Sequence, residues 1–346
     1  MQRRPPSLVL GAAMILLLTS CAPSPEPIPT RTPVVEGSQS PTPSPEPAVE
    51  PEPAFDVDCD DVDAALAGVI GESTTPVRPV MSLISTMNWI PGPAQHMFQR
   101  AGGIACSAGD DSASWEVLLV PGADAVIAGA SERLGYWGER ASCEEGGYCH
   151  FEFPDGQVLL SATLHDPKLE GADAAKIEEA LRTLLAEAAA SVHEFALGDS
   201  DIVGTRCERF ITTAELSQLL GTEVEEFTDF GGWGVPAEVY SVVNGSVHCL
   251  YTSPGSGYEV DIFLQVTTLP AGAWAFEEQE GEVVVVEGTN AAIASKGEHG
   301  ESILDVLIGP DWIRFMTFDN GSGAVDPVPL ATVIVRNLTI GHTAPQ

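Results

Sequence analysis

The stretch Gly102-Gly103-Ile104-Ala105-Cys106 decides the fold, because its glycine and cysteine recur 143 positions later in Gly245-Ser246-Val247-His248-Cys249. The same ungapped offset joins further turn and strand residues in the two halves of the chain. These pairs are Pro93-Ala94 with Pro236-Ala237 and Trp115-Glu116-Val117 with Tyr258-Glu259-Val260. So many turn-forming, cysteine and aromatic residues do not share one spacing by chance, so the sequence predicts two tandem copies of one structural unit.

Both copies carry the same succession of helical and strand-like patterns. The second copy opens at Thr212, where Glu215 completes the spacing of a capping box before an apolar helical face. Strand-like runs cover 115–120, 158–164, 258–266, 283–286, 303–308 and 312–318. Helices are expected over 124–134, 173–192, 272–280 and 327–337, and apolar helical patterns also open each copy, at Val62–Ile70 and Leu216–Leu220. Short strands flanked by helices predict an α+β fold, with each repeat an antiparallel sheet covered by helices.

Composition divides the rest of the chain. Residues 1–20 read as a signal peptide and 21–54 as a proline-rich linker that cannot bury enough apolar surface to fold. The first repeat is then expected over 55–197, a connector over 198–205 and the second repeat over 206–342. The formal net charge of −35 argues against binding nucleic acid, which requires a basic surface.

The N-terminus predicts export and a lipid anchor. Arg3 and Arg4 precede an apolar run that is too short to span a bilayer, as in an export signal. Leu18-Thr19-Ser20-Cys21 resembles the bacterial lipobox, which implies that the Cys21 thiol is acylated and holds the chain on the extracytoplasmic face of the cell membrane. The alternative is an ordinary signal peptide that happens to contain a cysteine.

The six cysteines after Cys21 indicate disulfides, because an even number in an exported chain is typical of a disulfide framework. The repeat favours one long-range pair in each copy, Cys59 with Cys106 and Cys207 with Cys249. Cys143 and Cys149 are expected to pair across a turn. A metal site is the alternative for them, but the chain has no Cys-x-x-Cys pair to support it.

Two α+β units in one acylated chain resemble the tandem-domain lipoproteins of high-GC Gram-positive, actinobacterial species. An abundance of alanine and glycine with little lysine agrees with such a source. Some related lipoproteins have a fold like that of the photosystem II extrinsic protein PsbP, which the resemblance therefore implies here. No motif in the resemblance implies an activity.

One segment has the pattern of a catalytic motif. Leu197-Gly198-Asp199-Ser200-Asp201 resembles the nucleophile block of the GDSL-type serine hydrolases. That family also needs a late Asp-x-x-His, and none of the seven histidines has an aspartate three residues before it. The segment is therefore interpreted as a polar connector, with an exported serine hydrolase that uses Ser200 as the alternative function.

Other candidate sites are weaker. His150 and Glu152 share one face of a strand but are too few to hold a metal, and Asp56–Asp63 lacks the glycine and distal glutamate of an EF-hand. Trp89 and Trp233 lie in Gly- and Pro-rich turns, where an aromatic side chain could stack on a sugar or lipid. No metal or cofactor is expected. The sequence predicts a non-catalytic envelope binding or assembly module, with a lipid, a glycan or a protein as its partner.

Overall fold

The computed structural model describes residues 48–79, 92–133, 135–228, 234–255, 261–297, 299–321 and 324–340, all within the unit Pro47–Gln346. The predicted anchor Cys21, residues 21–47 of the proline-rich linker, Trp89 and Trp233 lie outside the described residues. The linker was predicted to end at Ala54, but Ala54 is buried and its N–H donates to the Gly102 carbonyl at 2.8 Å, so the folded part begins before residue 55.

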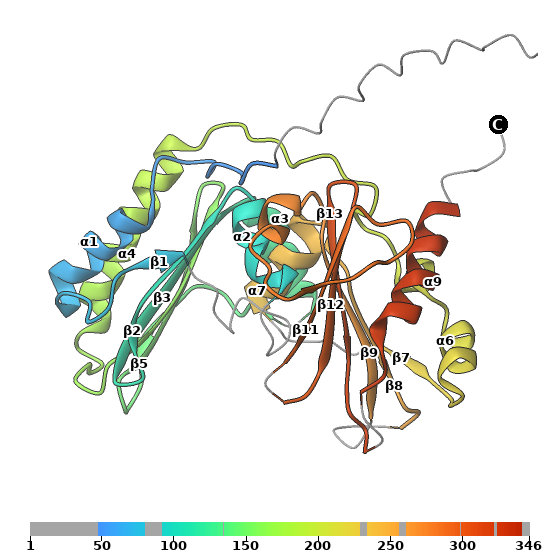
Figure 1. The fold of residues 1–346 in the computed structure, drawn as a ribbon. Coiled ribbons are helices and arrows are strands. Elements are labelled where there is room, and N and C mark those ends of the chain that lie inside the picture. The colour runs from blue at the N-terminus through green and yellow to red at the C-terminus, as the bar shows by residue number, and fades with distance from the viewer. Residues whose placement is uncertain are drawn as a thin grey trace, which may run out of the picture. The chain divides into compact units, whose positions relative to one another are not determined.

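The first repeat contains a six-stranded antiparallel sheet in the order β1-β2-β3-β6-β5-β4 (Figure 1). Its strands are β1 (Arg78–Pro79), β2 (Ile104–Asp110), β3 (Ala113–Pro121), β4 (Arg140–Cys143), β5 (Tyr148–Asp155) and β6 (Val158–His165). Helices α1 (Cys59–Ile70) and α4 (Ala174–Ser191) pack on one face, which we call the first face. The Asp58 side chain caps α1, and the apolar side of α4 completes this core.

The second repeat contains a seven-stranded sheet in the order β10-β11-β12-β13-β9-β8-β7. Its strands are β7 (Glu225–Phe227), β8 (His248–Thr252), β9 (Ile262–Leu269), β10 (Glu282–Val283), β11 (Ala291–Lys296), β12 (Ser302–Ile308) and β13 (Asp311–Thr317). Helices α5 (Cys207–Phe210), α6 (Thr213–Leu220) and α9 (Pro327–Ile340) accompany it. Apart from β10, the strand order repeats that of the first sheet, so the predicted α+β fold of two tandem repeats is confirmed.

Short helices lie at the second face of each sheet and bring the repeats together. The first repeat contributes the 3₁₀ turn η1 (Pro93–His96), α2 (Met97–Arg100) and α3 (Ala123–Glu132). The second contributes α7 (Gly234–Glu238), the π-helical turn η2 (Val239–Val243) and α8 (Ala273–Phe276). One buried apolar cluster unites Met97 and Phe98 with Val239 and Tyr240, so the repeats share a core between their sheets.

Register shows where the sequence repeat holds and where it fails. Cys106 pairs with Val117 in the first sheet, whereas Cys249 pairs with Val266 in the second. The ungapped offset therefore ends at the cysteines, because the counterpart of Val117 is Val266 and not Val260. The residues Tyr258–Val260 themselves lie outside the described residues. The second hairpin is longer, joining Thr252 to Ile262 where the first joins Asp110 to Ala113.

Two predicted elements of the second repeat are shorter than expected. The strand predicted over 283–286 is reduced to Glu282–Val283, and Val285 is exposed. The helix predicted over 272–280 is a single turn, because it closes over the buried rings of Trp274 and Phe276 and then ends. Leu219, predicted on the apolar face of α6, is exposed, and only Leu216 of that helix is fully buried.

Candidate functional site

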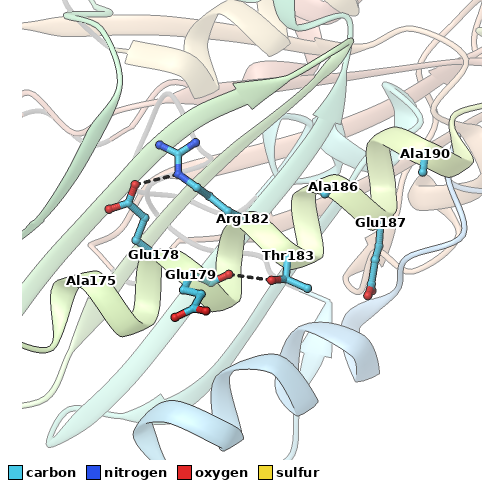
Figure 2. A pocket seen from close by; sticks show the side chains of 8 residues that line it. All are labelled: Ala175, Glu178, Glu179, Arg182, Thr183, Ala186, Glu187 and Ala190. Atoms are coloured by element: carbon cyan, nitrogen blue, oxygen red, sulfur yellow. Dashed lines mark hydrogen bonds and ion pairs between the residues drawn. The ribbon is translucent and has the colours of Figure 1, made fainter.

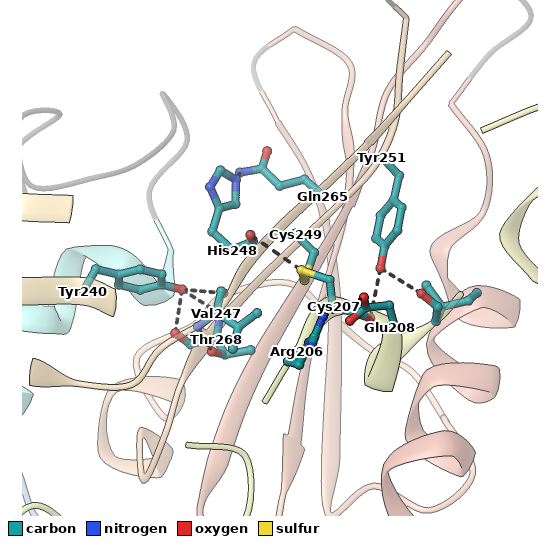
Figure 3. The surroundings of a disulfide bond; sticks show 11 residues. Arg206, Cys207, Glu208, Tyr240, Val247, His248, Cys249, Tyr251, Gln265 and Thr268 are labelled. Atoms are coloured by element: carbon teal, nitrogen blue, oxygen red, sulfur yellow. Dashed lines mark hydrogen bonds and ion pairs between the residues drawn. A yellow bond between two sulfur atoms is a disulfide. The ribbon is translucent and has the colours of Figure 1, made fainter. Parts of the chain in front are cut away.

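The structure forms the three predicted disulfides. Cys59–Cys106 and Cys207–Cys249 each tie the opening helix of a repeat to the strand that begins its main hairpin, β2 or β8. Cys143–Cys149 closes the β4–β5 turn. Around the second-repeat disulfide, the Tyr251 hydroxyl lies 2.9 Å from the Ile211 carbonyl oxygen, and His248 Nε2 lies 2.8 Å from Gln265 Nε2 (Figure 3). These contacts are structural, because the first binds the end of helix α5 to the sheet and the second joins the neighbouring strands β8 and β9.

The Ser200 hydroxyl is engaged by the turn that contains it. It accepts a hydrogen bond from the Ile202 N–H at 3.2 Å and bonds the carboxylate of Asp311. Asp311 also accepts from the Ala271 N–H at 2.8 Å, and burial raises the pKa of this carboxyl. The partners of Ser200 are thus a backbone amide and a carboxylate, which suit a connector.

The acidic run at the start of the first repeat is a helix cap. Asp58 Oδ1 accepts from the N–H groups of Asp60 at 2.9 Å and Asp61 at 3.1 Å, and Asp61 Oδ2 accepts from the Asp58 N–H at 3.1 Å. This is a capping box that supports α1. In the part of the chain that the structure describes, no group of three or more His, Cys, Asp or Glu side chains is placed to hold a metal ion.

A shallow depression of about 720 Å³ runs along the outer surface of α4 (Figure 2). All of its lining residues belong to that one helix, and several of them are alanines. Its polar groups are already paired, since Arg182 Nε donates to Glu178 Oε1 at 2.8 Å, Arg182 Nη2 donates to Glu139 Oε2 at 2.8 Å, and the Thr183 hydroxyl donates to the Glu179 carbonyl at 2.9 Å. With no side chains converging from a second element, this surface is not a ligand site.

A better candidate is a cavity of about 430 Å³ on the second face of the first sheet, which we call the groove. Strand β5 places His150 and Glu152 in it, and β6 places Ser161 and Thr163 beside them. Arg140 of β4 lies on the far side of Glu152. The period-two alternation of these strands explains the arrangement, because residues of the same parity face the same side of a sheet.

The groove holds a carboxyl group with an unusual proton affinity. Burial raises the pKa of Glu152 to about 7, although Arg140 acts in the opposite direction. Arg140 bonds elsewhere, with Nη2 2.8 Å from Glu144 Oε1. Among the described residues, the carboxylate of Glu152 has neither a hydrogen bond nor an ion pair. Burial and then Arg140 lower the pKa of His150, so its imidazole is uncharged at neutral pH.

One wall of the groove is the loop before β4, where Trp137 is 82% exposed. The loop is held close to the second repeat, because a Cβ on Gly135 would lie only 2.7 Å from the Gly234 backbone nitrogen. Trp137 is the aromatic residue that sequence reasoning missed. Its signal was a tryptophan between two glycines, Gly135 and Gly138, and it lacked the repeated Pro-Ala neighbours that drew attention to Trp89 and Trp233.

The corresponding face of the second sheet is filled. Arg314 and Asp305 form a buried ion pair there, with Nε 2.7 Å from Oδ1 and Nη2 2.8 Å from Oδ2. Trp312 Nε1 donates to the same Asp305 Oδ1 at 2.7 Å, and the ring of Trp312 lies 5.6 Å from that of His96. Burial and nearby Arg314 lower the pKa of His96 to about 4.

No family model matches the chain, and neither a curated protein nor a solved structure is found to be similar to it. The resemblance to PsbP-like lipoproteins therefore stays a prediction. No helix within the described ranges combines the length and the apolar character needed to cross a membrane.

Proposed function

We propose that this chain is an exported, lipid-anchored protein that binds an envelope ligand in the groove of its first repeat and does not transform it. In this proposal Cys21 carries the lipid, the proline-rich linker is a spacer, and the second repeat supports the first. The protein acts from the extracytoplasmic face of the cell membrane.

One observation carries the proposal: the second face is closed by side chains in the second repeat, but part of it is open in the first repeat. In the second repeat that face is closed by Trp312, the Arg314–Asp305 pair and His96. In the first repeat the part of that face beside β4, β5 and β6 remains an open groove with a half-buried carboxyl, an imidazole and hydroxyl groups. Convergent polar groups beside an exposed aromatic side chain are typical of a binding site.

The polar groups suit binding better than hydrolysis. Ser161 and Thr163 are the hydroxyl groups nearest to His150 across the β5–β6 pairing, with Thr163 directly opposite it. Both hydroxyls lie on a regular strand rather than on the strained turn that exposes a nucleophile in many hydrolases. The groove therefore offers donors and acceptors for a ligand without an activated nucleophile.

The anchor is tested by metabolic labelling with an alkyne fatty acid in a bacterial host. The full chain should take up the label and fractionate with membranes, and Cys21→Ala should lose both properties. An unlabelled wild-type chain found in the medium would overturn the anchored part of the proposal.

The binding part is tested by native mass spectrometry on the full chain, purified in mild detergent and exposed to a small-molecule extract of the cell envelope. We expect a discrete added mass on the wild type and its loss in Trp137→Ala and His150→Ala. Glu187→Ala, an exposed change on α4, is the control. A mass that survives both groove variants would place the ligand elsewhere.

A further inference from the structure

The two repeats can be aligned residue by residue through their disulfides. In each sheet, the strand residue before the long-range cysteine begins a row of cross-strand partners on the second face. In the first sheet this row runs Ala105, Leu118, Ser161, Glu152, Arg140. In the second sheet it runs His248, Thr267, Arg314, Asp305, Ile293.

Within these rows, Glu152 is the counterpart of Asp305 and Ser161 is the counterpart of Arg314. Both repeats therefore keep an acidic side chain at one position of the row. Only the second repeat has an arginine at the next position, and the first has the small Ser161 instead.

In the second repeat, Arg314 forms a bidentate ion pair with Asp305. Nε and Nη2 of Arg314 each donate to one oxygen of Asp305, at 2.7 and 2.8 Å. The two side chains are only 6% and 2% exposed. The guanidinium carbon of Arg314 also lies 5.5 Å from the centre of the Trp312 ring. A planar cation is thus held by a carboxylate beside an aromatic ring.

The first repeat keeps the carboxylate of this arrangement without its cation, and a loop residue rather than a counterpart of Trp312 supplies an aromatic ring. Glu152 supplies the carboxylate, and the groove of about 430 Å³ opens over Ser161. Trp137 supplies an exposed ring in its wall. Arg140 does not replace Arg314, because its guanidinium is directed to Glu144 at 2.8 Å and to Ser142 at 3.4 Å.

We propose that the groove binds a guanidinium group of its ligand, which pairs with Glu152 where Arg314 pairs with Asp305 in the second repeat. This inference rests on the proposed function, because it assigns the chemistry of the same groove. A planar fork matches a carboxylate by two parallel hydrogen bonds, which an ammonium group cannot do. The net charge of −35 also favours the approach of cations at low ionic strength. The guanidinium belongs either to a small molecule or to an arginine of a peptide.

The test uses titration calorimetry on the full chain in mild detergent, at pH 8 and low salt, where Glu152 is mostly ionised. The probes are n-butylguanidine and n-butylammonium, which share one apolar tail. We expect the guanidine to bind at least about 10-fold more tightly than the ammonium. A neutral capped tripeptide with a central arginine, acetyl-Gly-Arg-Gly-amide, distinguishes the sources. Tighter binding than butylguanidine indicates a polypeptide ligand, and weaker binding indicates a small molecule.

Three variants test the site. Glu152→Gln keeps the volume of the side chain and should weaken butylguanidine binding by about 10-fold or more. Ser161→Arg copies the second repeat, so its new side chain should pair with Glu152 and abolish binding. Glu187→Gln makes the same change of charge on exposed α4 and should leave affinity unchanged. If Ser161→Arg fails to fold, Glu152→Gln decides alone.

Equal affinities for the two probes, or full affinity in Glu152→Gln, would overturn the inference. Its failure is distinguishable from failure of the proposed function. If the chain binds a molecule from envelope extract, if that binding requires Trp137 and His150, and if butylguanidine does not bind, then the proposed function holds and the ligand has a different chemistry. A chain that does neither lacks both.

Discussion

Arg100 of α2 in the first repeat is hydrogen-bonded to Asn244, the residue after η2 in the second repeat. Arg100 Nη1 donates to the Asn244 backbone carbonyl at 3.0 Å and to its side-chain oxygen at 3.1 Å. Asn244 Nδ2 donates in return to the Met97 carbonyl at 2.8 Å. Arg100 Nε also donates to the carbonyl of Pro270. Arg100 and Asn244 are both buried, and these hydrogen bonds of Arg100 all run to acceptors in the second repeat.

Replacing Arg100 should therefore weaken the whole fold. Arg100→Met keeps most of the side-chain volume but leaves the oxygens of Asn244 and Pro270 without donors. We expect the free energy of unfolding to fall by about 3 kcal/mol, measured by urea denaturation. Arg206→Met is the control, because the Arg206 side chain is largely exposed. A loss of less than about 1 kcal/mol would show that water replaces the arginine at this junction.

Loss of charge at the matched acids of the two repeats should change stability in one repeat and not in the other. Asp305→Asn breaks a buried pair with Arg314 and should lower the free energy of unfolding by about 3–5 kcal/mol. Glu152→Gln removes a carboxyl group whose ionised form is disfavoured by burial, so no loss is expected at pH 8. Chemical denaturation of both variants measures the contrast. Equal losses would contradict the assignment of Glu152 as an unpaired acid.

The long-range disulfides should contribute more to stability than the short one. Cys207 and Cys249 are 42 residues apart, and Cys143 and Cys149 only 6. In the chain-entropy model the longer loop is worth about 4 kcal/mol and the shorter about 2 kcal/mol. Guanidinium denaturation of the double alanine variants of each pair tests this order. A greater loss for the 143–149 pair would mean that native contacts of the β4–β5 turn outweigh chain entropy.

Acid should destabilise the protein through two histidines, the buried His96 and the half-buried His248. Burial lowers the folded-state pKa of both His96 and His248 to about 4, from an ordinary value near 6.5. The unfolded state therefore binds more protons between these values. The stability is fully present above pH 6.5 and is lost as the pH falls toward 4, by up to about 3 kcal/mol for each group.

Thermal melts from pH 7.5 to 4 measure this loss. His96→Gln and His248→Gln should each flatten the dependence of melting temperature on pH, although either variant can lower the temperature itself. His193→Gln, a change at an exposed position just after α4, is the control. Parallel curves for all four proteins would exclude the imidazoles of His96 and His248 as the cause.

The sequence predicted the features that depend on local pattern. The capping box at Thr212, the periodic face of α4 and the cysteine pairs all follow from short-range chemistry or from the repeat. The internal repeat also predicted two units with one topology. The ungapped alignment of the repeats was wrong where the hairpin lengths differ, because it does not allow for the extra residues between Thr252 and Ile262.

The groove depended on information that no single stretch contains. His150 and Glu152 were recognised as neighbours on a strand, but their partners Ser161 and Thr163 come from the next strand and the exposed Trp137 from a loop. Whether Glu152 meets an arginine depends on cross-strand register, as the contrast with Asp305 shows. Burial of the second-repeat face by His96 is likewise a contact between distant segments.

The shared cluster of Met97 and Phe98 with Val239 and Tyr240 affects how the protein survives in a protease-rich environment. The irregular connector at 192–206 is the natural place for an enzyme to cut, and many of its residues are exposed. A cut there would break one peptide bond but leave the core from both halves intact. The nicked chain would migrate as one particle in gel filtration, and the distal half would stay attached to the anchored half without a covalent link.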